Sequence, residues 1–233
     1  MSETTAPQSK IKLAKSLLME HEELGSAYLD SQLPDKAYGI VVDSINENEY
    51  AEVDFDTAEV AMLATSMQAK LLLKQNSTQE SQSKYNEALH WSNRALELTD
   101  DPSLQCKIYA QQGLFHVRLK DFESASTSFE NAHILGDEDP QLLAEILLYE
   151  HHIYASGDSP MYDPESAVRH LQEAQRLFKM LGDEKHSKYA ERYILAVLAR
   201  SRKIGKLAKH IVKSGKSMMS DRGQLAKRFA KGK

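Results

Sequence analysis

Apolar residues recur along most of this chain at intervals of three and four, the spacing that places side chains on one face of an α-helix. Residues 58–74, 87–98 and 186–199 show it clearly. No long stretch alternates apolar and polar residues as a half-buried β-strand does. The pattern therefore predicts an all-α protein made of consecutive amphipathic helices.

Residues 105–139 contain the most informative stretch, in which two helical patterns are separated by a tight turn near Asp121. Gly113 is small enough to let one helix approach another closely, and Ala125, twelve residues later, does the same from the second helix. Phe129 is the large residue expected to fill the space between them, with Ala132 following it. This spacing predicts a closely packed antiparallel pair of helices.

Two polar stretches interrupt the helical pattern. Residues 75–83 are rich in Gln, Ser and Asn, and residues 156–163 contain Gly157 and Pro160, so both are predicted to be loops. Proline is tolerated in the first turn of a helix, where its missing N–H costs nothing. Pro34 and Pro164 are therefore expected to begin helices.

The Gly113-to-Ala125 step resembles the tetratricopeptide (TPR) repeat. Further matching positions in the same repeat are Tyr109, Leu119, Phe122, Phe129 and Ala132. His116 departs from the pattern, because that position is usually large and aromatic. An earlier step from Gly25 to Ala37 resembles the same repeat, and the resemblance covers about residues 18–183.

The resemblance implies a right-handed TPR-type solenoid whose concave groove binds peptides. It divides the chain into a flexible N-terminus (residues 1–8), about four TPR-like helix pairs (9–183), a C-terminal capping helix (184–200) and a basic amphipathic tail (201–233). The capping helix is expected because stacked repeats need a terminal element with a polar outer face.

The first helix of each TPR lines the groove, so the resemblance implies two sets of groove residues. They are Glu22, Ser26 and Asp30 in the first repeat, and Lys107, Gln111, Leu114 and Arg118 in the third. Family members that clamp the carboxylate end of a chaperone tail use a specific Lys, Asn and Arg set. Lys107 matches one of these positions, but Glu22, Ser26 and Gln111 replace the others, so this chain is not expected to bind such a tail. The acidic residues of the first set suit a basic partner instead.

Composition adds limits to this interpretation. Of the 233 residues, 41% are apolar and 27% charged, as in an ordinary globular protein, and no apolar run approaches the roughly 18 residues of a membrane-spanning helix. Cys106 is the single cysteine, so no intrachain disulfide can form, and a cytoplasmic location is expected. Oligomeric state is not predicted.

The net charge of −5 conceals a strong asymmetry. Residues 200–233 hold twelve Lys and Arg and one acid, whereas residues 1–199 carry a net charge of −16. Apolar residues from Ile204 to Met219 recur at helical spacing, and the cations fill much of the remaining face. The tail cations singled out are Lys203, Lys206, Lys209, Lys213, Lys216, Lys227 and Arg228. Three roles remain open: packing on the preceding helix, binding nucleic acid or an anionic membrane, and docking onto the acidic repeats.

A catalytic function has little support in the sequence. None of the nine histidines falls in a two-histidine zinc spacing, and no phosphate-binding glycine loop is present. His151 and His152 are adjacent, so they should point about 100° apart on a helix, one packed and one exposed. We therefore expect no cofactor, no metal and no catalysis.

The predicted function is a protein–protein interaction module, namely an adaptor, scaffold or assembly chaperone. The alternative is a regulatory protein that contacts nucleic acid or an anionic membrane through its tail.

Overall fold

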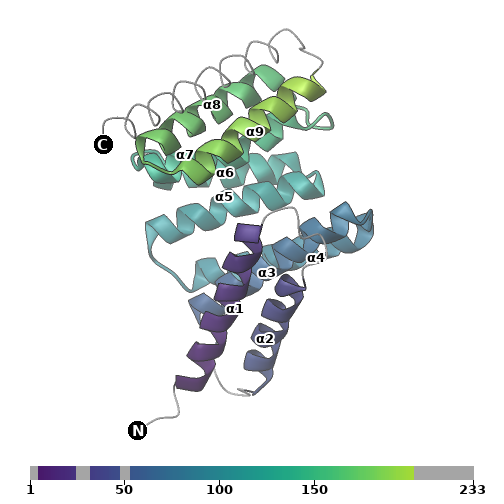
Figure 1. Cartoon of the computed structure of the whole chain (residues 1–233), viewed down its shortest axis with the longest axis vertical. Helices are drawn as coiled ribbons and strands as arrows, with labels where there is room; N and C mark the ends of the chain where they lie inside the picture. Colours follow the sequence, from purple (N-terminus) through teal and green to yellow (C-terminus); the bar gives the residue numbers. More distant parts are fainter. Residues whose placement is uncertain (1–4, 25–31, 48–52, 202–233) are drawn as a thin grey trace, which may run out of the picture. The chain divides into compact units, whose positions relative to one another are not determined.

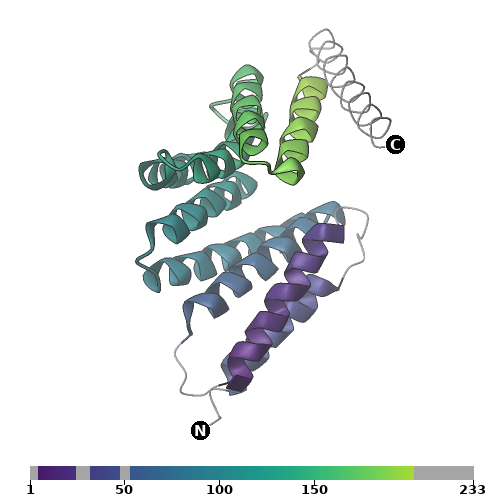
Figure 2. The ribbon, with the colours of Figure 1, turned by 60° about the vertical axis from the view of Figure 1, so that its left-hand side comes forward.

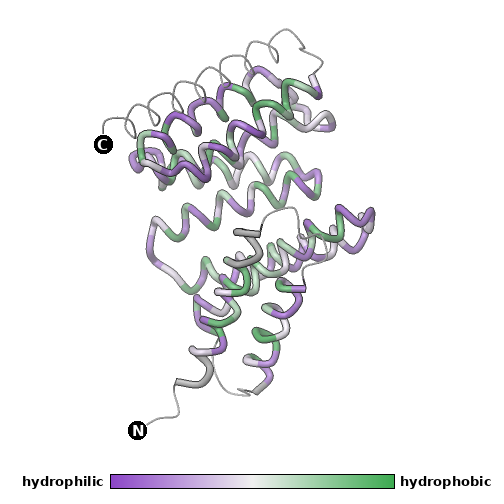
Figure 3. Tube along the Cα trace, viewed as in Figure 1, coloured by the Kyte–Doolittle hydropathy of each residue, from purple (hydrophilic) through white to green (hydrophobic). Residues whose placement is uncertain are grey.

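The computed structural model describes residues 5–24, 32–47 and 53–201, and the elements in these ranges are α-helices joined by turns and loops (Figure 1). The helices are α1 (Thr5–Leu24), α2 (Leu33–Glu47), α3 (Phe55–Lys74), α4 (Thr78–Glu97), α5 (Pro102–Leu119), α6 (Phe122–Gly136), α7 (Pro140–Ala155), α8 (Pro164–Met180) and α9 (Glu184–Arg200). The prediction of an all-α chain is confirmed for this part of the molecule. Along these helices hydrophobic and hydrophilic residues alternate in short segments, as amphipathic helices require (Figure 3).

Aspartate caps the N-terminus of six described helices. In each case the carboxylate accepts a hydrogen bond from a backbone N–H of the first turn, which has no partner within the helix. The caps are Asp54 on α3, Asp101 on α5, Asp121 on α6, Asp139 on α7, Asp163 on α8 and Asp183 on α9. Proline follows the cap in α5, α7 and α8, so helix starts are encoded by local sequence.

The chain divides into two compact units, residues 1–149 and 150–233, and the boundary falls inside α7. In the first unit, helices adjacent in sequence pack together, α1 on α2, α3 on α4 and α5 on α6 (Figures 1 and 2). One core joins α1, α2 and α3 through Ala14, Val41 and Ala61. A second core joins α3, α4 and α5 through Met62, Tyr85 and Phe115.

A buried triad at positions i, i+4 and i+7 recurs on the second helix of each predicted pair. The triads are Ala37–Val41–Ser44 on α2, Ala88–Ser92–Ala95 on α4, Ala125–Phe129–Ala132 on α6 and Ala167–Leu171–Ala174 on α8. The first and last members are small in every case, which lets a neighbouring helix approach closely. These helices thus share one packing pattern although their middle residues differ in size.

Gly113 on α5 lies against Phe129 on α6, as predicted. A Cβ atom at position 113 would stand 2.7 Å from the Phe129 ring, closer than atoms can approach without a shift. A second close contact, at Gly136, was not predicted. A Cβ there would lie 2.5 Å from the Cys106 sulfur and 3.1 Å from Leu142.

The prediction of a loop over residues 75–83 is wrong. Only three residues separate α3 from α4, and Asn76 reverses the chain with a left-handed backbone (φ 64°). Ser81 is buried and its hydroxyl donates to the Ala69 carbonyl oxygen at 2.8 Å. The polar residues of this stretch form the exposed face of the first turns of α4, which is why they resemble a loop in sequence.

At the N-terminus, α1 begins at Thr5, before the boundary expected at residue 9. Gly25, which was expected to mark a close helix crossing, lies outside the described residues. The small residue that α1 places in the core is Ala14, which is fully buried beside Ile11 and Leu18.

The second unit comprises the end of α7 together with α8 and α9. The loop predicted over residues 156–163 is present between α7 and α8, and Asp163 N–H donates to the Tyr154 carbonyl oxygen across its base. α8 packs on α9 after a short turn at Gly182, whose φ of 78° favours glycine. The helix predicted over residues 186–199 is present as α9.

Candidate functional site

The groove residues predicted for the third repeat occupy one stripe of α5. Lys107, Gln111, Leu114 and Arg118 follow one another at offsets of 0, 4, 7 and 11, so they lie on consecutive turns of the same helix face. Lys107 is exposed, Gln111 and Arg118 are half-buried, and Leu114 is buried. We call these four residues the α5 stripe.

Neighbouring helices fix the orientation of α5 from two other sides. Towards α4, Gln112 Nε2 donates to Ser92 Oγ at 2.9 Å and to Asn93 Oδ1 at 2.8 Å. Phe115 packs against Tyr85 of α4, with ring centroids 6.0 Å apart. Towards α6, Gly113 meets Phe129. The residues that anchor α5 to α4 and α6 are thus different from those of the α5 stripe.

Two polar atoms of the stripe have no hydrogen-bond partner among the described residues. They are Oε1 of Gln111 and Nε of Arg118, both shielded from solvent. The hydroxyl of Tyr85 on α4 also lacks a partner there. Burial raises the pKa of Tyr85, and the nearby positive charge of Arg118 opposes this rise. Because an unpaired buried polar group costs about 1–3 kcal/mol, the stripe holds hydrogen-bonding capacity that the fold itself does not use.

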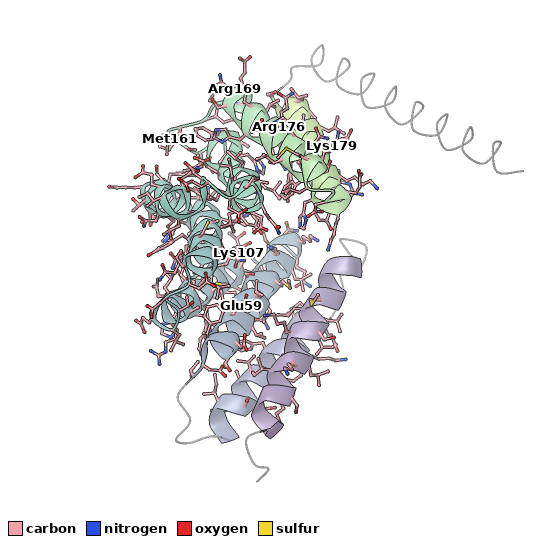
Figure 4. All side chains as sticks on the ribbon, turned by 90° about the vertical axis from the view of Figure 1, so that its left-hand side faces the viewer. Glu59, Lys107, Met161, Arg169, Arg176 and Lys179 are labelled. Carbon is pink, nitrogen blue, oxygen red and sulfur yellow. The ribbon has the colours of Figure 1, made fainter. Side chains whose placement is uncertain are left out.

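The stripe also carries two positive charges. Within the described part of the chain, neither Lys107 nor Arg118 forms an ion pair. Other cations of the first unit do: Lys15 Nζ lies 2.7 Å from Glu59 of α3, and Lys84 Nζ lies 2.8 Å from Glu87. Figure 4 shows Lys107 on α5 and Glu59 on α3.

On α8 of the second unit, two exposed arginines contact partners on the same helix. Arg169 donates to Ser166 Oγ at 2.8 Å, and Arg176 forms a bidentate contact with Glu173 at 2.6 and 2.9 Å. Both lie on α8 with Lys179, as Figure 4 shows. The α5 stripe therefore differs from these α8 cations in holding half-buried polar atoms that lack hydrogen-bond partners among the described residues.

The predicted separation of His151 and His152 is confirmed in part. His151 is fully buried, whereas His152 is half-buried rather than exposed. Their rings lie 4.0 Å apart between centroids, and Tyr193 of α9 lies 4.9 Å from the His151 ring. The Tyr193 ring also lies 5.4 Å from the His152 ring, which explains why this second imidazole is partly covered.

The structure does not describe the side chains of the remaining predicted site residues. Glu22 belongs to the last turns of α1, and its side chain is not described. The other candidates lie outside the described residues: Ser26, Asp30, Lys203, Lys206, Lys209, Lys213, Lys216, Lys227 and Arg228. Tyr85 was not identified from the sequence, although it precedes the small residue Ala88 by three positions on the same helix.

Two further features can be stated for the described residues. They contain no group of three or more His, Cys, Asp or Glu side chains arranged to hold a metal ion. None of their helices has the length and hydropathy needed to cross a membrane. What the α5 stripe can do chemically is donate and accept hydrogen bonds and attract negative charge.

Comparison with known proteins concerns the fold. No protein-family model matches the chain, and no curated protein matches it. Among solved structures, the chain is similar to the crystal structure of BtubC (BKLC) from P. vanneervenii, with 17% sequence identity and a TM-score of 0.53. The match covers 94% of this chain and 93% of BtubC. At this level of identity, the likeness shows a shared all-helical fold.

Proposed function

We propose that this chain is a non-catalytic protein–protein interaction module, an adaptor, scaffold or assembly chaperone, that binds an extended peptide segment along the α5 stripe. The observation that carries the proposal is the unused hydrogen-bonding capacity of Gln111 and Arg118. Both atoms are shielded from solvent in the unbound chain, so binding would require the half-buried Gln111 and Arg118 side chains to turn toward the peptide. An extended peptide offers alternating N–H and C=O groups, so it could then supply both the donor that Gln111 Oε1 lacks and an acceptor for the guanidinium.

The proposal includes the architecture that the TPR resemblance implies. The helix pairs would form a right-handed solenoid with α9 as its cap, and the protein would act in the cytoplasm. The repeated buried triad on α2, α4, α6 and α8 supports equivalent helix pairs, because repeats that stack on one another need the same packing surface.

A blocking substitution tests the peptide site. An array of twelve-residue peptides would be probed with the full chain, with Gln111→Trp and with Gln82→Trp, which adds the same bulk on an exposed position of α4. Peptides bound by the unaltered chain should lose binding to Gln111→Trp and keep it with Gln82→Trp. If Gln111→Trp folds normally by circular dichroism and binds the same peptides equally well, the α5 stripe is not the binding site.

The alternative function is regulation through nucleic acid or an anionic membrane, with the tail as the contact. Its support is the charge of +11 on residues 200–233. Such binding would weaken steeply with salt, whereas a peptide held by hydrogen bonds and packing would be less sensitive.

A further inference from the structure

We propose that the α5 stripe selects an acidic segment, in which two carboxylates four residues apart contact Lys107 and Arg118. This inference rests on the proposed peptide-binding function and specifies its partner. It differs from the basic partner suggested by the acidic residues of the first repeat.

The spacing follows from helix geometry. Eleven residues separate Lys107 from Arg118, which at the rise of an α-helix corresponds to about 16 Å. An extended chain advances about 3.3 Å per residue and its side chains alternate between two faces, so only residues an even number apart can both face α5. Positions i and i+4 are about 13 Å apart, and the long side chains of Lys107 and Arg118 can cover the remaining difference. Two acidic side chains at these positions of an extended segment running along α5 would therefore reach both cations.

The charge of the stripe contrasts with its surroundings in sequence. Residues 1–149 hold 11 Lys and Arg against 25 Asp and Glu. An acidic segment would be repelled by most of this unit, and it would be attracted to cations that are not engaged in ion pairs. Such a contrast gives specificity, because binding away from the stripe is penalised.

Carboxylates do occur near one end of the stripe. Asp137, Asp139 and Glu145 act electrostatically on Cys106, the residue beside Lys107. None of them forms an ion pair with Lys107, although nearby negative charge weakens the attraction at this end. Arg118 is thus expected to be the stronger contact, because it is half-buried and can bind a carboxylate through two nitrogens.

Gln111 lies between the two cations and would hold the backbone of the segment. Its amide can donate and accept at once, and its Oε1 lacks a partner among the described side chains. Leu114 is buried and adds little contact area. Recognition would therefore depend on charge spacing and backbone hydrogen bonds.

Fluorescence anisotropy with the full chain tests this inference. Four labelled twelve-residue peptides would share one neutral background and carry two Asp four residues apart, two adjacent Asp, two Lys four residues apart, or no charge. The first should bind most tightly. Lys107→Ala and Arg118→Ala should each weaken it about tenfold, the typical effect of removing a hydrogen bond to a charged group. Arg94→Ala removes an exposed, paired arginine from α4 and should change nothing.

A charge swap separates the stripe from the basic tail, which could also attract acidic peptides. Arg118→Glu should lose the first peptide and should bind a version in which one Asp is replaced by Lys. If the peptide binds to the tail, substitutions at positions 107 and 118 should not change its affinity. Because Lys107 is exposed, Lys107→Ala keeps the test valid if a change at Arg118 affects folding, which circular dichroism would reveal.

The outcomes distinguish this inference from the function on which it rests. Equal binding of the spaced and adjacent Asp peptides, or no effect of Lys107→Ala and Arg118→Ala, would overturn the acidic specificity. If the Lys or neutral peptide then binds best and Gln111→Trp abolishes its binding, the stripe remains a peptide site of another preference. If Gln111→Trp affects no peptide, both proposals fall.

Discussion

At position 113 the packing of α5 against α6 leaves no space for a side chain. The Phe129 ring fills the volume that a Cβ would occupy, and both residues are buried. Gly113→Ala should therefore destabilise the chain, and Phe129→Ala should cost about 3–5 kcal/mol through the cavity that it leaves. Thermal and urea unfolding would measure both changes.

A double variant tests whether the two residues act as a pair. Phe129→Leu shortens the side chain and should recover part of the stability lost in Gly113→Ala. The destabilisation of the double variant should then be smaller than the sum of the two single effects. Additive effects would contradict the direct contact between these positions.

Two other glycines should respond in opposite directions to alanine. Gly39 lies within α2, and a Cβ there would meet nothing within 4 Å, so Gly39→Ala should stabilise by about 1 kcal/mol through helix propensity. Gly136→Ala should destabilise, because its Cβ would press on Cys106 and Leu142. Unfolding midpoints that move in the same direction would disagree with this packing.

At the scale of elements, the early start of α4 can be tested by hydrogen exchange. Amides 82–86 should exchange slowly, since they donate within a helix that is pinned by the Ser81 contact to Ala69. The amides of Asn76 and Ser77 lie in the turn between α3 and α4 and should exchange faster than amides 82–86. Fast exchange throughout residues 75–83 would restore the loop that the sequence suggested.

The capping aspartate of α6 should make stability depend on pH. Hydrogen bonds from Ser124 hold the pKa of Asp121 below its ordinary value. A carboxyl group whose pKa is lower in the folded chain stabilises it above the unfolded pKa of about 3.9, and this contribution is lost as pH falls through the folded value. Asp121→Asn should flatten the pH dependence of the melting temperature below pH 4 while keeping a cap.

Asp121→Ala would remove the cap altogether. It should cost about 1 kcal/mol at neutral pH, the usual effect of deleting an N-cap side chain. A melting temperature that Asp121→Ala leaves unchanged at neutral pH and below pH 4 would show that α6 does not depend on this residue. Asp100 is exposed and does not occupy the N-cap position of any described helix, so Asp100→Ala serves as the control.

What the sequence could predict at this scale depended on the size and polarity of particular residues. Gly113, Ala125 and Phe129 differ so strongly in size that their spacing identified a helix pair. The prediction for the stretch before Tyr85 was wrong, because Ser81 is buried through a hydrogen bond to a distant carbonyl that no local pattern shows. The close packing at Gly136 was missed for a similar reason, since its neighbours come from two other helices.

The candidate site was predictable in position and only partly in character. Helical spacing places Lys107, Gln111 and Arg118 on one face, as the structure does. That Gln111 and Arg118 hold polar atoms without partners depends on the surrounding packing, including Tyr85 from another helix. The spacing of residues along one helix does not show whether a polar atom finds a hydrogen-bond partner on another helix.

At the scale of the whole molecule, charge is divided along the chain. Residues 1–149 carry a net charge of −14 and residues 150–233 a net charge of +9. If the tail contacts polyanions, replacing Lys203, Lys206 and Lys209 by Gln should lower the salt concentration at which the chain elutes from heparin. For each lysine that binds an anionic group, its replacement should also reduce the salt dependence of binding by about one unit of slope.

A matched change in the first unit is the control for this measurement. Replacing the exposed residues Lys36 and Lys74 by Gln removes positive charge without touching the tail. Elution should then be nearly unchanged. Equal shifts from both sets would mean that heparin responds to overall charge.

The triad shared by α2, α4, α6 and α8 has a consequence for how such a chain can change length during evolution. Inserting one residue into any of these helices turns everything beyond it by about 100°, which would carry a small residue such as Ala132 out of its contact. Duplicating or deleting a complete helix pair preserves the spacing of every triad. Surviving length differences among descendants of this gene should therefore come as whole helix pairs, or as additions to the loop over residues 156–163, and rarely as single codons within a helix.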